Sequence, residues 1–91
     1  MKRVSAQISG RVQGVSYRYF ALNQARRLSL SGWVRNEADG SVSLVAEGEQ
    51  EALEALLDRL RQGPPAAWVA DVRVQWSVAS REFDGFQVKF R

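Results

Sequence analysis

The sequence predicts an α/β (α+β) sandwich in which two helices cover one face of an antiparallel sheet. Hydrophobic and polar residues alternate in four longer stretches, as in strands with one buried face, and in two stretches they recur at helical spacing. The stretches follow one another as strand, helix, strand, strand, helix, strand, and a short strand follows at the end. Each helix then spans a crossover, and right-handed crossovers place both helices on the same face.

A glycine-containing loop separates the first strand from the first helix. Val4, Ala6 and Ile8 alternate with polar residues and are expected to form the buried face of the strand. From Tyr17 the period changes, and the helix that begins there should end near residues 30–32. Ser16 is the predicted N-cap of this helix. Its apolar stripe consists of Tyr17, Ala21, Ala25 and Leu28.

A hairpin and a second helix follow. Residues 32–37 and 41–47 predict two strands, and Asp39-Gly40 between them is a strong hairpin signal because both residues tolerate positive φ. Residues 49–61 give the clearest helical pattern, and Gly63-Pro64-Pro65 stops that helix. Its apolar stripe consists of Leu53, Leu56, Leu57 and Leu60.

Two further strands complete the pattern. The fourth strand is expected to bury Val72, Val74, Trp76 and Val78. After Asp84-Gly85, residues 86–90 predict a short final strand. The order β-α-β-β-α-β predicts a ferredoxin-like topology, with a four-stranded antiparallel sheet plus a short C-terminal strand. A length of 91 residues leads us to expect a single domain spanning residues 1–91.

The composition indicates a globular protein, with 45% hydrophobic and 10% aromatic residues. No apolar run approaches the ~20 residues of a membrane helix. The first residues turn polar too soon for a signal peptide, so we expect a cytoplasmic location without membrane contact. Thirteen basic and ten acidic side chains give a net charge of +3. That excess favours anionic partners and is too small to indicate nucleic-acid binding. No exposed apolar stripe demands a partner, so we expect a monomer.

The chain contains no histidine and no cysteine. Phosphohistidine and cysteinyl-phosphate intermediates, Ser-His-Asp triads and zinc sites with nitrogen or sulfur ligands are therefore excluded. The four aspartates are scattered without the spacing of a calcium loop. We therefore predict no metal and no cofactor. Any hydrolysis must use arginine, lysine, asparagine, carboxylates, hydroxyls or backbone amides.

The stretch Gly10-Arg11-Val12-Gln13-Gly14-Val15-Ser16-Tyr17-Arg18 has the features of an anion-binding loop. Gly10 and Gly14 are expected to shape the loop and to let its backbone approach a ligand. The helix start behind it offers unpaired N–H groups at the positive end of the helix dipole. Arg18 adds a planar, charged fork that suits phosphate oxygens. The predicted phosphate-binding residues are Gln13, Gly14, Val15, Ser16, Tyr17 and Arg18.

Residues 10–18 resemble the signature loop of the acylphosphatase family. Gly32-Trp33-Val34-Arg35-Asn36, followed by Asp39-Gly40, resembles its second signature. The resemblance to a small stand-alone acylphosphatase runs nearly from end to end. It implies Arg18 and Asn36 as catalytic residues, brought together by the ferredoxin-like fold. One departure is Ser29, at a position where relatives often carry glycine.

The resemblance implies a metal-independent hydrolase that converts small acyl phosphates to a carboxylate and inorganic phosphate by direct attack of water. Arg18 and the loop amides would hold the phosphoryl group, and Asn36 would orient the water, since an amide binds water without taking up charge.

Two alternatives to this function stay open. One is a non-catalytic phosphate or metabolite sensor that keeps the loop. The other, favoured less, is an RNA-binding module of the same topology, which would need aromatic residues on the central strands. Those strands instead offer Ser5, Gln7, Ser43, Val45 and Glu47 opposite their buried faces.

Overall fold

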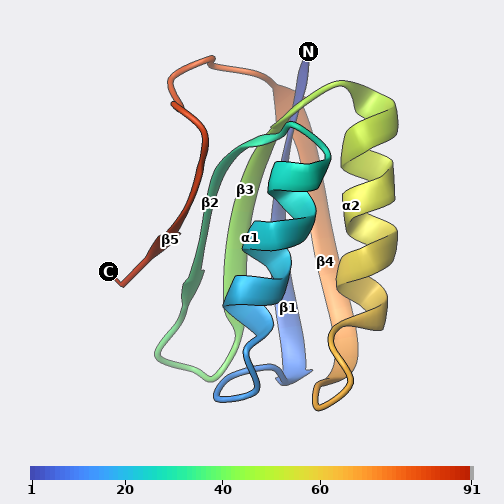
Figure 1. Cartoon of the computed structure of the whole chain (residues 1–91), viewed down its shortest axis with the longest axis vertical. Helices are drawn as coiled ribbons and strands as arrows, with labels where there is room; N and C mark the ends of the chain where they lie inside the picture. Colours follow the sequence, from blue (N-terminus) through green and yellow to red (C-terminus); the bar gives the residue numbers. More distant parts are fainter. Residues whose placement is uncertain (91) are drawn as a thin grey trace.

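A computed structural model of the chain describes residues 1–90. Its elements are β1 (Lys2–Arg11), α1 (Tyr17–Arg27), β2 (Ser31–Asn36), β3 (Val42–Gly48), α2 (Gln50–Gln62), β4 (Trp68–Val78) and β5 (Phe86–Lys89). The strands form one sheet in the order β4-β1-β3-β2-β5, and both helices lie on the same face of it (Figure 1). The predicted ferredoxin-like topology is confirmed. Within residues 1–90 the two helices, of 11 and 13 residues, are too short to cross a membrane.

The first four strands pair in antiparallel fashion, with β1 between β3 and β4. Ala6 of β1 lies opposite Leu44 of β3 on one side and Val74 of β4 on the other. The short strand β5 joins the sheet beside β2 and runs parallel to it, with Gly32 opposite Phe86. The chain thus crosses from one edge of the sheet, at β4, to the other edge, at β5.

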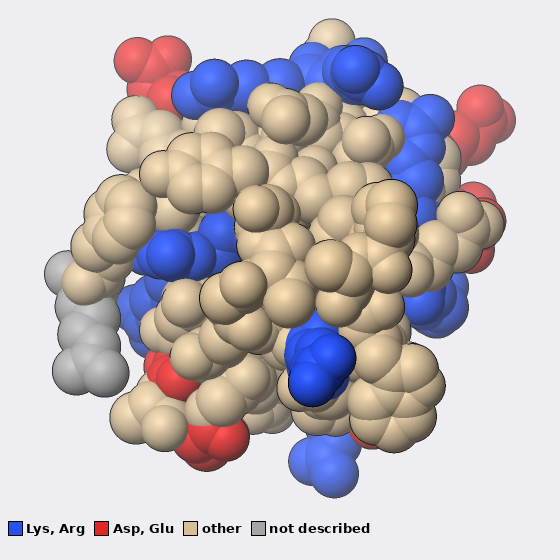
Figure 2. Space-filling view, turned by 60° about the horizontal axis from the view of Figure 1, so that its bottom comes forward, with Lys and Arg blue, Asp and Glu red and all other residues tan. Residues whose placement is uncertain are grey.

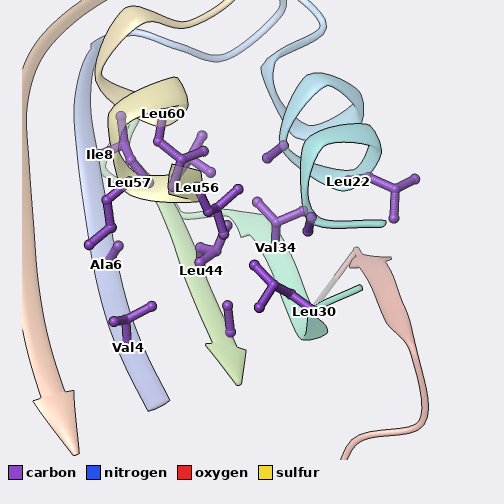
Figure 3. Close-up of a cluster of buried hydrophobic side chains, with 14 of the residues drawn as sticks. Val4, Ala6, Ile8, Leu22, Leu30, Val34, Leu44, Leu56, Leu57 and Leu60 are labelled. Atoms are coloured by element: carbon purple, nitrogen blue, oxygen red, sulfur yellow. The ribbon is translucent and has the colours of Figure 1, made fainter. Parts of the chain in front are cut away.

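The core fills the space between the helices and the sheet (Figure 3). The predicted buried faces of β1 and α2 are confirmed, because Val4 and Ile8 are fully buried and the leucine stripe of α2 packs over them. The prediction for β4 is only partly right. Val72 and Val74 pack against the core, whereas Trp76 is 40% and Val78 84% exposed. The far half of β4 is exposed because this strand forms the edge of the sheet.

The two ends of α1 differ from the expectation. Ser16 is in the N-cap position but takes a left-handed conformation, with φ 64°, and its side chain makes no capping hydrogen bond. A capping side chain needs extended backbone to reach the first-turn N–H groups. The helix ends at Arg27, a few residues early, and the chain leaves it through Ser29 with φ 57°. This left-handed position explains why glycine would suit residue 29.

Tyr17 anchors the start of α1 to the end of α2. Its side chain is 1% exposed, and its hydroxyl donates a hydrogen bond of 2.7 Å to the carbonyl oxygen of Leu60. Burial raises the pKa of the Tyr17 phenol far above its ordinary value, so the hydroxyl stays a donor. The bond also satisfies one of the last carbonyl groups of α2, which a helix cannot pair internally.

Glu47 lies on the sheet face opposite the helices, where we expected an exposed side chain, but it is buried. Its carboxylate accepts hydrogen bonds from Arg3 Nε at 2.7 Å and from the N–H groups of Ser80 and Arg81 at 2.8 and 2.9 Å. The connection between β4 and β5 therefore covers it. Burial alone would raise the pKa of Glu47, but these hydrogen bonds outweigh burial and lower the pKa to about 2.

Replacing Tyr17 by Phe keeps the buried ring and removes its hydrogen bond to Leu60. We expect the free energy of unfolding in urea to fall by about 1 kcal/mol, because a buried carbonyl loses its partner. Tyr19, whose side chain is exposed, provides the control, and Tyr19→Phe should leave the midpoint nearly unchanged. Equal midpoints for Tyr17→Phe and the parent protein would show that the bond does not stabilise the fold.

The pKa of Glu47 predicts how stability depends on pH. A depressed carboxyl pKa stabilises the fold at pH values above the ordinary value of 4.5, and this contribution is lost as pH falls through the folded value of about 2. Glu47→Gln should lower the free energy of unfolding at pH 7 by about 1.5–3 kcal/mol. It should also flatten the decline in stability between pH 4.5 and pH 2. Glu54→Gln on the exposed face of α2 is the matched control. If the stability of Glu47→Gln declined between pH 4.5 and pH 2 as steeply as that of the parent protein, Glu47 would not be a cause of that decline.

Candidate active site

The loop between β1 and α1 and the turn between β2 and β3 lie at the same end of the molecule (Figure 1). Arg18 is near the start of α1, and Asn36 is the last residue of β2. The fold therefore brings together two side chains that lie in different elements. Both line the same two neighbouring hollows, one on the side of the loop and one on the side of the hairpin.

Two residues of the loop take left-handed backbone conformations, Gly14 with φ 74° and Ser16 with φ 64°. Gly14 thus lies in the loop that it was expected to shape. Gly10, which was also expected to shape the loop, lies instead within β1, where the register with β4 shifts. A Cβ atom at Gly10 would collide with the carbonyl oxygen of Trp68, so the glycine allows a close approach of the two strands.

The start of α1 presents backbone donors without helical partners. Its first hydrogen bond runs from the Phe20 N–H to the Ser16 carbonyl oxygen at 3.0 Å. The N–H groups of Tyr17, Arg18 and Tyr19 precede it and have no acceptor within the helix. The first turn contains no acidic residue that would neutralise the positive end of the helix dipole. This helix start can therefore bind an anion.

The side chain of Gln13 ties the loop to the hairpin. Its Nε2 donates to the carbonyl oxygens of Glu37 at 2.8 Å and of Ser41 at 2.9 Å. Glu37 and Ser41 flank the turn and are themselves joined by a backbone hydrogen bond of 2.8 Å. The sequence predicts Gln13 only as a member of the loop. No local pattern reveals this side-chain role, because both partners lie in a distant element.

Asn36 contains a buried oxygen without a partner. Within residues 1–90, its Oδ1 is the one buried side-chain oxygen or nitrogen that makes no hydrogen bond. Leaving such a group unpaired costs about 1–3 kcal/mol. Native proteins pair nearly all buried polar groups, with water or a ligand where protein groups are lacking. The amide of Asn36 therefore has hydrogen-bonding capacity that the protein itself does not use.

The hollow on the loop side has a volume of about 250 Å³. The hollow on the hairpin side has about 340 Å³. Gly14, Ser16 and Tyr19 line the first in addition to Arg18 and Asn36. Gln13, Lys89 and Phe90 help to line the second, where the guanidinium carbon of Arg18 lies 4.9 Å from the centre of the Phe90 ring.

Positive charge dominates the side chains at these hollows. The one carboxylate among their lining residues, Glu37, accepts a hydrogen bond of 2.7 Å from Arg35 Nε, and this bond lowers the pKa of Glu37. Figure 2 shows this end of the molecule, with basic side chains set between uncharged residues and acidic side chains toward the margins. Within the described residues, no group of three or more acidic side chains could hold a metal ion. The arrangement suits a small anion.

Comparisons with known proteins agree with one another. The acylphosphatase family model matches residues 4–88. The acylphosphatase of Salinibacter ruber is 56% identical over 88 residues, which cover 97% of this chain and 93% of that protein. The crystal structure of acylphosphatase from Bacillus subtilis superimposes with a TM-score of 0.96 at 34% identity, covering 99% of this chain and all of that one.

A second structure, an acylphosphatase from Coxiella burnetii, has a TM-score of 0.90 at 35% identity and covers 97% of this chain and 92% of its own. The likeness therefore extends over the whole sheet and both helices, and it includes both stretches on which the sequence resemblance was based. From its sequence and its fold together, the chain belongs to the acylphosphatase family and is an enzyme of that kind.

Proposed function

We propose that this chain hydrolyses the carboxyl-phosphate bond of small acyl phosphates by direct attack of water, with Arg18 and Asn36 as its catalytic side chains. The observation that carries the proposal is the buried, unpartnered Oδ1 of Asn36, on a side chain that lines the same hollows as Arg18. Family membership supports the reaction class. One place for a phosphoryl group and one for a water then lie next to each other.

The reaction suits a chain without histidine and cysteine. Water attacks phosphorus, a new P–O bond forms, and the P–O bond to the acyl group breaks. An acyl phosphate dianion and water thus give a carboxylate and dihydrogen phosphate. The leaving carboxylate has a conjugate acid with a pKa of about 4, so it departs without a general acid. What the enzyme must supply is position and electrostatic stabilisation of the phosphoryl oxygens.

The phosphoryl group binds at the start of α1. Its oxygens accept hydrogen bonds from the backbone N–H groups of residues 13–18, and the helix dipole adds to the attraction. The guanidinium of Arg18 binds two oxygens at once, because its donors lie in one plane. The bridge from Gln13 to the hairpin supports this role, since it fixes the loop relative to β2.

Asn36 holds the attacking water. Its Oδ1 accepts a hydrogen bond from the water and keeps a lone pair of the water directed at phosphorus. The amide takes up no proton, so both protons of the water leave with the dihydrogen phosphate product. This role would explain why the Oδ1 of Asn36 has no hydrogen-bond partner within the protein, because the oxygen gains its partner when the water binds.

The purified protein should hydrolyse benzoyl phosphate and acetyl phosphate in the presence of EDTA, with inorganic phosphate as a competitive inhibitor. Arg18→Ala should lose both turnover and phosphate binding, because it removes the charged fork. Arg27→Ala, in the last turn of the same helix, is the matched control and should remain active.

Two other results would favour the alternative functions. Phosphate binding without turnover by the folded parent protein would favour the sensor. Steep, salt-dependent binding of single-stranded RNA would favour the RNA-binding module.

Asn36→Ala should separate binding from chemistry. We expect kcat to fall about 10²–10³-fold, as for the loss of one transition-state contact, while the inhibition constant of phosphate stays within a factor of about two. Asn23→Ala, on the exposed surface of α1, is the matched control. Nearly full activity in Asn36→Ala would remove this residue from the mechanism.

A further inference from the structure

Phe90 is a large apolar side chain in an unusual place. It is 68% exposed, and its ring lies under the guanidinium of Arg18, 4.9 Å from ring centre to Cζ. An aromatic side chain with so little burial contributes little to a core. The face of its ring, however, carries negative charge density that attracts a cation.

The pairing of β5 with β2 places Phe90 beside the site. The two strands run parallel, and their last pair is Arg35 opposite Lys89. Asn36 is the next residue of β2, and Phe90 directly follows the end of β5. Both residues line the hollow on the hairpin side together with Arg18. The C-terminal strand therefore extends to the same end of the sheet as Asn36.

Helix α1 contacts β5 at two points. Arg26 donates from Nε and Nη2 to the carbonyl oxygen of Phe86, at 3.2 and 3.0 Å. The guanidinium carbon of Arg18 lies over the ring of Phe90, which directly follows the strand. Eight helical residues rise about 12 Å, and four residues of a parallel strand extend about 13 Å. The two spacings match, so the helix can hold both ends of the strand at once.

We propose that Phe90 is a positioning residue that holds the guanidinium of Arg18 ready for the phosphoryl group; this inference rests on the proposed role of Arg18. An arginine side chain loses considerable rotamer freedom when it binds a ligand. The ring under the guanidinium carbon restricts that freedom beforehand. The ring contains no oxygen or nitrogen acceptor, so the N–H donors remain available to phosphate oxygens.

The test is the affinity for inorganic phosphate, measured by calorimetry and as a competitive inhibition constant. Phe90→Leu keeps an apolar side chain and removes the π system. We expect it to weaken phosphate binding and raise KM about two- to fivefold. Phe90→Trp and Phe90→Tyr should restore the parent values. Trp68→Leu is the matched control, because Trp68 is 66% exposed on the opposite edge of the sheet.

Three outcomes would decide the matter. Unchanged phosphate affinity in Phe90→Leu, with Arg18→Ala impaired, would overturn the inference and leave the proposed function standing. Unchanged phosphate affinity in Arg18→Ala would instead show that Arg18 does not bind phosphate. The inference and the proposed function would then both fail, because both depend on that role. If Phe90→Leu weakened binding and neither aromatic variant restored it, the residue would act through its shape and not through its ring, and the proposal would be wrong.

Discussion

The unpaired amide groups at the start of α1 can serve the site only if the helix begins directly behind β1 and does not fray. The rest of the structure depends on that constraint. Tyr17 holds the start of α1 on the core side, because its buried hydroxyl donates a hydrogen bond from the first residue of α1 to the last turn of α2. Gln13 holds the loop before α1, because its side chain donates hydrogen bonds to the hairpin. The proposed binding of phosphate by backbone N–H groups, in a chain without histidine or cysteine, thus depends on side chains that need not touch the ligand.

The strand order supplies the second condition. Because β2 lies between β3 and β5, the end of β2 has a neighbour on each side. The hairpin fixes the position of Asn36, and β5 brings Phe90 level with it. The site is therefore assembled from the beginning, the middle and the end of the chain. Its geometry is a property of the whole sheet and not of any one motif.

The sequence allowed most of the fold to be predicted, because burial at every second residue in strands and along one stripe of α2 reflects a single apolar core. The errors lie where another part of the chain decides the outcome. The position of β4 at the sheet edge exposes Val78, and the connection before β5 buries Glu47. Ser16 has the side chain of a cap and the backbone of a loop. The bridge from Gln13 and the contact of the Arg18 guanidinium with the Phe90 ring join distant segments, so no local pattern could reveal them.

The parallel pairing of β5 with β2 has a consequence for association between molecules. A sheet edge offers unpaired backbone groups to any other strand, and β5 covers that edge of β2 with only a short strand. At the opposite edge, β4 is interrupted by the register shift beside Gly10 and carries Asp71 and Arg73 on its exposed positions. An irregular, charged edge is a poor template for addition of a strand. The short strand β5 and the irregular, charged strand β4 thus make both edges of the sheet poor templates for pairing with another strand.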